Sequence, residues 1–277
     1  MYLMSWAIFC IGAGDCVGKS RRTGKMAAFV QSGCGRHRRA GRPRTARREG
    51  APRCAIATPT ALSPGRALRD ALSKPGIRLM PCCFDALSAR LVERAGFEFT
   101  FMSGFAAAAV NGLPDTGLMC YEEVRRQLAT ITETNGIPVI CDADTGYGNA
   151  INAKRTIAGL AAAGAGGIMI EDQVAPKRCG HTKGKDVVDF DTAVMRMQAA
   201  VDARDACAED VVIVARTDAA KIFGMDEAIR RANTFREIGA EVTFIEAPNS
   251  IEAMHRQATP TRLTLILGPT LGSALTS

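Results

Sequence analysis

Three carboxylates directly follow short apolar runs of the chain, and carboxylates are the side chains that hold hard metal ions in proteins. Asp142, Asp144 and Glu171 occupy these positions, and no cluster of histidine and cysteine accompanies them in the sequence. Oxygen ligands completed by water molecules suit Mg²⁺ or Mn²⁺ rather than zinc. A metal there would act as a Lewis acid on an oxygenated, anionic substrate. The alternative is that these carboxylates cap helices or pair with Lys154 or Arg155.

A second set of reactive residue types lies in a glycine- and lysine-rich stretch, residues 175–189. Cys179 is flanked there by Lys177, Arg178 and His181. Positive neighbours favour the thiolate, so Cys179 is a candidate proton donor and acceptor, with Lys177 and His181 as further candidate catalytic residues. The length, the glycines and the charge of this stretch are typical of a mobile lid that closes over an anion.

Other polar residues also end apolar runs, and they are candidates for binding a substrate. Arg216 is suited to hold a substrate carboxylate through two parallel hydrogen bonds. Ser103 and the amide of Gly104 are candidates for the second carboxylate, and Glu246 ends a further apolar run. Asp115 either orients a metal-bound water or is a turn residue. These residue types together predict a site for a small dicarboxylate.

Seven short apolar runs, rich in β-branched and aromatic residues, predict the strands that position these groups. Longer stretches between most of them predict helices, among them Tyr121–Thr134, Asn152–Ala163 and a helix from Asp226, its expected N-cap, to Gly239. Continuous apolar strands that alternate with helices favour a parallel sheet covered on both faces. The predicted strands are Arg78–Cys82, Phe97–Met102, Ile137–Cys141, Gly167–Ile170, Val211–Ala215, Val242–Ile245 and Leu263–Leu267.

The candidate groups follow five of these strands in succession. In a closed parallel barrel the C-terminal ends of the strands converge on one face, where the loops that follow them build the active site. We therefore predict an α/β fold, a (β/α)₈ barrel over residues 61–277, with the site at that face. The sequence stops about ten residues after the seventh predicted strand. A barrel truncated there is expected to leave two strand edges open.

Several motifs together resemble the isocitrate lyase/phosphoenolpyruvate mutase superfamily, and within it the petal-death-protein-like plant branch and the 2-methylisocitrate lyases. The similarity runs over residues 68–246, roughly two thirds of the chain. The motifs that carry it are Pro81–Ala89, Ser103–Phe105, Leu113–Gly117, Asp142–Asn149, Glu171–Gln173, Lys177–His181 and Ala215–Asp218.

The resemblance implies a role for most of the candidate residues. It implies a (β/α)₈ barrel that binds Mg²⁺ through the three carboxylates at the strand ends. It also implies Ser103, Gly104 and Arg216 as substrate contacts, and Cys179 as the acid/base that lyases of the superfamily carry in a gating loop. Mutases of the superfamily lack this cysteine, so its presence favours cleavage of a C–C bond over rearrangement of a P–C bond.

The residues and the resemblance together predict an Mg²⁺-dependent carbon–carbon lyase. Its expected substrates are small 2-hydroxy or 2-oxo dicarboxylates of the 2-alkylmalate, 2-methylisocitrate or oxaloacetate class, cleaved through an enolate. Two alternatives stay open: a phosphonate mutase of the carboxyvinyl-carboxyphosphonate phosphorylmutase type, and an inactive, truncated remnant. The resemblance further implies a homo-oligomer, which is a tetramer in relatives.

Residues 1–60 differ in composition from the rest of the chain. They hold 12 basic and two acidic residues, whereas the remainder carries a net charge of −3. A nucleic-acid-binding core is therefore excluded, and the apolar start, Met1–Gly14, is too short to cross a bilayer as a helix. We predict a basic, mostly disordered targeting leader over residues 1–60. Import into a plastid is expected, with a mitochondrion or the cytoplasm as alternatives, and no membrane partner.

Overall fold

The structure is a computed structural model that describes residues 9–12, 62–248 (except 77, 181 and 183), 252 and 264–267. One sheet organises this part of the chain. Its nine strands follow the order β2-β1-β9-β8-β7-β6-β5-β4-β3. The pairs from β3 through β9 are all parallel. The strands are β1 (Phe9–Gly12), β2 (Arg78–Met80), β3 (Cys82–Cys83), β4 (Thr100–Met102), β5 (Val139–Asp142), β6 (Gly167–Glu171), β7 (Val212–Thr217), β8 (Val242–Ile245) and β9 (Thr264–Leu267).

The seven predicted strands are all present. The first of them is divided at Pro81 into β2 and β3, because proline has no backbone N–H to contribute to a ladder. The parallel pairing places the C-terminal ends of the strands at one edge of the sheet, which is where the sequence analysis expects the site. Polar residues at those ends are thereby brought together from segments far apart in the chain.

Strand β1 lies in the segment predicted as a leader, where no strand was expected. It pairs antiparallel with β2 and with β9, so that Ile11 stands opposite Arg78 on one side and Leu265 on the other. The edge of β9 that the truncated barrel was expected to leave open is therefore covered, because an apolar segment with unused backbone N–H and C=O groups adds a strand there. The strand order still ends at β2 and β3, so the sheet is not closed, as expected of a truncated barrel. The division of the chain at residue 60 stays a prediction.

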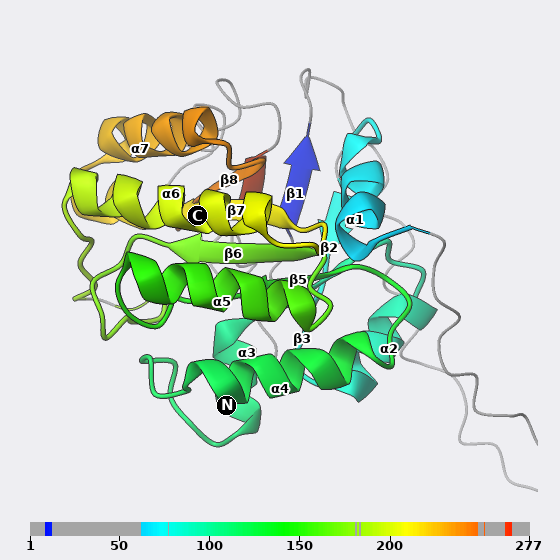
Figure 1. Ribbon diagram of the computed structural model, residues 1–277. Coiled ribbons are helices and arrows are strands. Elements are labelled where there is room, and N and C mark those ends of the chain that lie inside the picture. The colour runs from blue at the N-terminus through cyan, green and yellow to red at the C-terminus, as the bar shows by residue number, and fades with distance from the viewer. Residues whose placement is uncertain are drawn as a thin grey trace, which may run out of the picture. The chain divides into compact units, whose positions relative to one another are not determined.

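Helices connect successive parallel strands and pack beside one another. Figure 1 shows α4, α5, α6 and α7 side by side in chain order in front of the strands. Within the described residues, no helix is both long and apolar enough to cross a membrane. The helices are α1 (Pro64–Ser73), α2 (Ala86–Arg94), α3 (Gly104–Val110), α4 (Tyr121–Thr132), α5 (Ala150–Ala162), α6 (Phe190–Ala206), the 3₁₀ turn η1 (Ala219–Lys221) and α7 (Met225–Ile238).

The predicted helices are confirmed, with one correction at a helix start. Gly224, at φ 90°, is the N-cap of α7, and Asp226 lies in the first turn instead. Glycine accepts this left-handed backbone conformation without strain, and the carboxylate in the first turn still interacts favourably with the helix dipole. Gly239 ends the helix as expected, and Asn149 caps α5 through hydrogen bonds to the amides of Ile151 and Asn152.

Two apolar layers form on opposite faces of the parallel strands. Successive residues of β6 alternate between them: Ile168 and Ile170 pack toward the surrounding helices, and Met169 packs on the other face with Val212 and Val214 of β7. Side chains of a strand alternate in this way because its repeat is two residues. Both faces are apolar, which is the property expected of a parallel sheet covered on each side.

A pair of leucines tests this assignment of the core. Leu128 on α4 is fully buried, whereas Leu87 on α2 is 68% exposed. We expect Leu128→Ala to lower the free energy of unfolding by about 2–5 kcal/mol, because it removes buried methyl groups and leaves a cavity. Leu87→Ala is expected to change it by less than about 0.5 kcal/mol. Urea denaturation of the two variants measures both values, and equal effects would contradict the assignment.

Candidate active site

The predicted site residues lie at the C-terminal ends of five neighbouring strands. Ser103 and Gly104 follow β4, and Glu246 follows β8. The remaining strand ends carry Asp142 and Asp144 at β5, Glu171 at β6 and Arg216 near the end of β7. His181 lies outside the described residues, so its predicted role is not tested.

Asp142 and Asp144 form the centre of the site. One oxygen of Asp142 accepts the amide N–H of Gly104 at 3.1 Å, and the other accepts the amide of Asp144 at 3.1 Å. Asp144 itself has a positive φ of 48°, a conformation that costs free energy and is typical of functional sites. One part of the expected alternative is wrong, because Lys154 pairs with Asp202 and Arg155 stacks over Tyr121. The capping part is found at Asp142, which accepts the amide of Gly104, the first residue of α3.

One carboxylate oxygen of the site, Oε1 of Glu171, is buried and has no hydrogen-bond partner within the described residues. Burial raises the pKa of Glu171 well above its usual range against the effect of Arg216, and burial raises the pKa of Asp144 to about 6, although its ion pair with Lys177 opposes the shift. A buried carboxylate oxygen that lacks a partner is stabilised by a cation, so Glu171 fits a hard metal ion.

The carboxylates do not by themselves form a closed coordination shell. Among the described residues, no group of three or more His, Cys, Asp or Glu side chains is close enough to hold one metal ion. Mg²⁺ characteristically keeps several water ligands and takes only one or two carboxylates directly. The donor set therefore fits a magnesium ion bound partly through water, and the assignment of three ligands stays a prediction.

Lys177 places a positive charge inside this acidic cluster. Its ammonium contacts Oδ1 of Asp115 and lies 2.7 Å from Oδ1 of Asp144. Burial alone would lower the pKa of Lys177, but the surrounding carboxylates outweigh it and raise the pKa well above the usual range. The contacts with two carboxylates therefore favour the charged form of Lys177, and its catalytic role stays a prediction. The arrangement also shows that Asp115 is more than a turn residue, since its carboxylate is part of the cluster.

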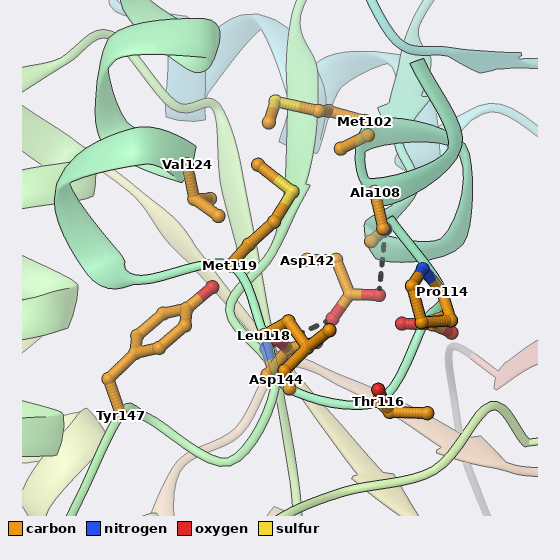
Figure 2. A pocket seen from close by; sticks show the side chains of 14 residues that line it. Met102, Ala108, Pro114, Thr116, Leu118, Met119, Val124, Asp142, Asp144 and Tyr147 are labelled. Atoms are coloured by element: carbon orange, nitrogen blue, oxygen red, sulfur yellow. Dashed lines mark hydrogen bonds between the residues drawn. The ribbon is translucent and has the colours of Figure 1, made fainter. Parts of the chain in front are cut away.

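Figure 2 shows the pocket beside this cluster. Asp142 and Asp144 lie at its centre, and Met102, Met119 and Val124 are drawn around one side of it. The free interior is about 10 Å³, which is space for about one water molecule. The hydroxyl of Tyr147, which also lines the pocket, is buried and has no hydrogen-bond partner within the described residues. The pocket is therefore acidic on one side and apolar on the other.

Residues 175–189, which we call the lid loop, lie against the site. The amide of Cys179 donates to the carbonyl of Asp115 at 3.1 Å. Gln173 fixes the preceding residue, because its side chain both accepts from the amide and donates to the carbonyl of Arg178, each at 3.0 Å. Sequence analysis missed Gln173, although it stands next to the acidic pair that ends β6. The half-buried Cys179 is thus held beside the carboxylate cluster.

At Gly180 the lid loop directly contacts two of the candidate substrate-binding residues. A Cβ atom at Gly180 would collide with Oε1 of Glu246 and lie 2.6 Å from Nη2 of Arg216. Only a residue without a side chain allows the loop to approach these two buried groups so closely. The loop therefore covers Arg216 and Glu246 in this structure.

Arg216 is surrounded by three carboxylates. Its Nε lies 3.1 Å from Glu171 and 2.8 Å from Asp218, and its Nη2 lies 3.2 Å from Asp218 and 3.5 Å from Glu246. Within the described part of the chain, no hydrogen bond or ion pair engages its Nη1. In this arrangement Nη1 is the nitrogen available to bind a substrate carboxylate. The predicted pair of parallel hydrogen bonds would also need Nη2, which becomes available only if Glu246 is displaced.

Ser103 and Gly104 have hydrogen-bond partners within the chain. The Ser103 hydroxyl accepts the amide of Ala106 at 3.5 Å as the N-cap of α3, and the Gly104 amide donates to Asp142. Binding of a substrate carboxylate through this amide would need the bond to Asp142 to be exchanged. The role of these two residues as substrate contacts therefore stays a prediction.

The comparisons with known proteins agree with this architecture. Residues 68–275 match the family model described as phosphoenolpyruvate phosphomutase. A "probable 2-methylisocitrate lyase 2" of Corynebacterium glutamicum is 47% identical over 66% of this chain and 59% of its own. The "petal death protein" of Dianthus caryophyllus is 42% identical over 73% and 64%, and the "carboxyvinyl-carboxyphosphonate phosphorylmutase, chloroplastic" of Arabidopsis thaliana is 44% identical over 64% and 53%. The chain thus spans between about half and two thirds of the length of these relatives.

Solved structures show the same fold. A crystal structure of 2,3-dimethylmalate lyase superposes with a TM-score of 0.66 at 39% identity, and covers 72% of this chain and 67% of that one. Phosphonopyruvate hydrolase in complex with oxalate and Mg²⁺ superposes with a TM-score of 0.62 at 30% identity, and covers 72% and 69%.

The fold and the site define the class first: an α/β protein of the barrel type, with a buried acidic cluster and a basic loop at the C-terminal ends of its strands. The family model matches well over half of the chain. The chain therefore belongs to the phosphoenolpyruvate phosphomutase family, and the predicted resemblance and fold class are confirmed.

The buried oxygen of Glu171 that lacks a partner leads to a prediction about metal binding that does not depend on turnover. Mg²⁺ in about hundredfold excess over its dissociation constant is expected to raise the melting temperature by roughly 5–10 °C, because it binds only the folded state. Glu171→Gln removes one donor and is expected to abolish most of this shift. Asp202→Asn alters a surface ion pair with Lys154 and serves as the matched control. A shift that survives Glu171→Gln, measured by scanning calorimetry, would contradict the metal site.

Proposed function

We propose that this protein is an Mg²⁺-dependent carbon–carbon lyase for small 2-hydroxy or 2-oxo dicarboxylates. The observation that carries the proposal is the position of Cys179, held by its amide to Asp115, which shares Lys177 with Asp144. A proton donor thus stands beside a cluster that fits a hard cation. The names of the relatives, which include lyases for 2-methylisocitrate and 2,3-dimethylmalate, support the same reaction class.

The residues would divide the work between binding and proton transfer. Asp142, Asp144 and Glu171 would hold Mg²⁺, directly or through water, and the ion would supply Lewis-acid polarisation of the substrate oxygen. Nη1 of Arg216 would bind a substrate carboxylate, and Glu246 would contact the hydroxyl end. Pre-organised charges of this kind stabilise an enolate that develops only in the transition state.

Proton transfer would fall to the lid loop. When the C–C bond of a 2-hydroxy acid breaks, the C2 hydroxyl would pass its proton to Glu246 and become the carbonyl of the 2-oxo acid. The electron pair of the broken bond would stay on the other fragment as a carbanion. Cys179 would donate its proton to that carbanion, and the covering loop would exclude water meanwhile. Lys177 stays charged, so its role would be to balance Asp115 and Asp144 rather than to exchange protons.

A related phosphonate reaction is the second candidate. It is favoured by the structural match to phosphonopyruvate hydrolase and by the Arabidopsis relative named as a phosphorylmutase. The two candidates share the acidic cluster and differ in the need for a proton donor in the loop. Cys179 therefore favours cleavage of the C–C bond.

The proposed reaction is tested by proton NMR of the full 277-residue chain, since residues 9–12 contribute a strand. The protein is incubated with Mg²⁺ and oxaloacetate, 2-alkylmalates, 2-methylisocitrate or phosphonopyruvate. We expect a 2-oxo acid and a carboxylate from a 2-alkylmalate or from 2-methylisocitrate, or acetate from oxaloacetate, whose cleavage consumes a water molecule. No product is expected after EDTA is added. Products from phosphonopyruvate alone would favour the second candidate. Dispersed methyl signals without turnover would support the inactive alternative.

A variant of the loop cysteine tests the assigned roles. Cys179→Ser is expected to lower kcat by at least about 10²-fold, which is the typical contribution of a positioned proton donor. Cys120→Ser changes an exposed cysteine at the start of α4 and is the matched control. Unchanged turnover in Cys179→Ser would show that another group protonates the product.

We also propose that the protein is plastid-targeted and that it assembles as a homo-oligomer. The basic composition of residues 1–60 and the chloroplastic Arabidopsis relative support the first, with a mitochondrion or the cytoplasm as alternatives. Import of a fluorescent fusion of residues 1–60 into isolated plastids tests the proposed targeting. Light scattering of the purified protein measures its mass in solution and so tests the proposed homo-oligomer.

A further inference from the structure

The lid loop carries a buried lysine that the proposed reaction does not use. The Lys185 side chain is only 3% exposed and forms an ion pair with Oδ1 of Asp218, which is fully buried. Lysine is almost never buried this completely unless a partner compensates its charge. No predicted motif included Lys185, and its position four to eight residues beyond Lys177, Cys179 and His181 indicates no role by itself.

Asp218 connects Lys185 to Arg216, the candidate residue for binding a substrate carboxylate. Its Oδ2 receives Nε of Arg216 at 2.8 Å, and its Oδ1 is shared between Nη2 of Arg216 at 3.2 Å and the ammonium of Lys185. One carboxylate therefore holds the arginine of strand β7 and the lysine of the lid loop at the same time. Because both cations use Oδ1, movement of one of them changes how fully this oxygen is available to the other.

The rest of the structure keeps Asp218 in place. Its amide donates to Asp172 at 2.9 Å, and the neighbouring Thr217 hydroxyl donates to the same carboxylate at 2.7 Å. Asp172 is in turn held by Arg231 at 3.0 Å, and Arg231 also donates to the carbonyl of Val188 at the end of the lid loop. Asp218 is thus a rigid anchor, and the lid loop is the part that can dock on it.

The excess of negative charge around Arg216 favours the contact of Lys185 with Asp218. Arg216 alone faces Glu171, Asp218 and Glu246, so its surroundings are strongly negative. Docking of Lys185 neutralises part of this charge and takes up Oδ1 of Asp218. Gly180 contacts Arg216 and Glu246 from the same loop, so the loop reaches this arginine at two separate points.

We propose that Lys185 is a positioning residue, which docks the lid loop on Asp218 and thereby couples the placement of Cys179 to the orientation of Arg216. The part that concerns Arg216 as a substrate contact rests on the proposed function. The docking itself does not, because it follows from contacts within the chain.

The test uses the reactivity of Cys179 toward iodoacetamide in the full chain, measured by mass spectrometry without substrate or metal. The exposed Cys120 provides an internal reference rate. We expect Lys185→Met to raise the Cys179 rate, relative to Cys120, on the order of tenfold, in the range of coupled neighbouring charges. Lys154→Met removes an exposed lysine of a surface pair and is expected to leave the ratio unchanged.

A double-mutant cycle separates docking from simple packing. If Lys185 acts through the charge of Asp218, then Asp218→Asn raises the rate in the same way, and adding Lys185→Met to it has little further effect. Lys185→Arg keeps the charge and is expected to lie closer to the wild type than Lys185→Met. Additive effects, or an unchanged ratio in a Lys185→Met protein that melts normally by circular dichroism, would overturn the proposal.

A folding defect does not obscure the result. If Lys185→Met melts at a lower temperature, the buried Cys83 and Cys141 report it, since global opening exposes them together with Cys179. Selective labelling of Cys179 supports the proposal, and labelling of all three cysteines at one rate contradicts it. If the lyase assay fails and the labelling result is positive, the proposed docking stands without the proposed function. If the lyase assay succeeds and the labelling result is negative, only the docking proposal is overturned.

Discussion

The burial of more negative than positive charge at one edge of the sheet is the constraint on which the site depends. Six carboxylates are almost fully buried there, and three cations lie among them. An isolated buried carboxylate costs several kcal/mol in desolvation, so each must find a partner or remain protonated. The carboxylates are Asp115, Asp142, Asp144, Glu171, Asp218 and Glu246, and the cations are Lys177, Lys185 and Arg216.

This imbalance explains why the lid loop lies where it does. Two of the three cations, Lys177 and Lys185, belong to the loop, and they contact different carboxylates on either side of Cys179. The loop is therefore held by charge at two points, and by the backbone of Arg178 and Cys179 between them. The remaining excess of negative charge, around Asp144 and Glu171, is what a divalent cation would balance.

The sheet supplies this concentration of charge through its topology. Parallel pairing from β3 to β9 sends every strand end to the same edge, and the apolar layers on both faces hold the strands in register. The antiparallel β1 adds to β2 and β9, so residues 9–12 belong to the same compact unit as the strands that carry the site. Composition alone describes this segment as part of a leader, because the backbone groups that it pairs with lie far away in the sequence.

The sequence alone determined the seven predicted strands, the helices between most of them and the residue types at the strand ends. Apolar periodicity and capping residues are local properties, so β5, β6 and β7 were predictable with Asp142, Glu171 and Arg216 at their ends, and the motifs were specific enough to indicate the family. What tertiary structure decided was the partner of each charge. Lys177 between Asp115 and Asp144, Gln173 on Arg178 and Lys185 on Asp218 are pairs that only packing selects. The energy of a buried ion pair depends on burial and on distances of a few ångströms, and neither is encoded in the spacing of residues along the chain.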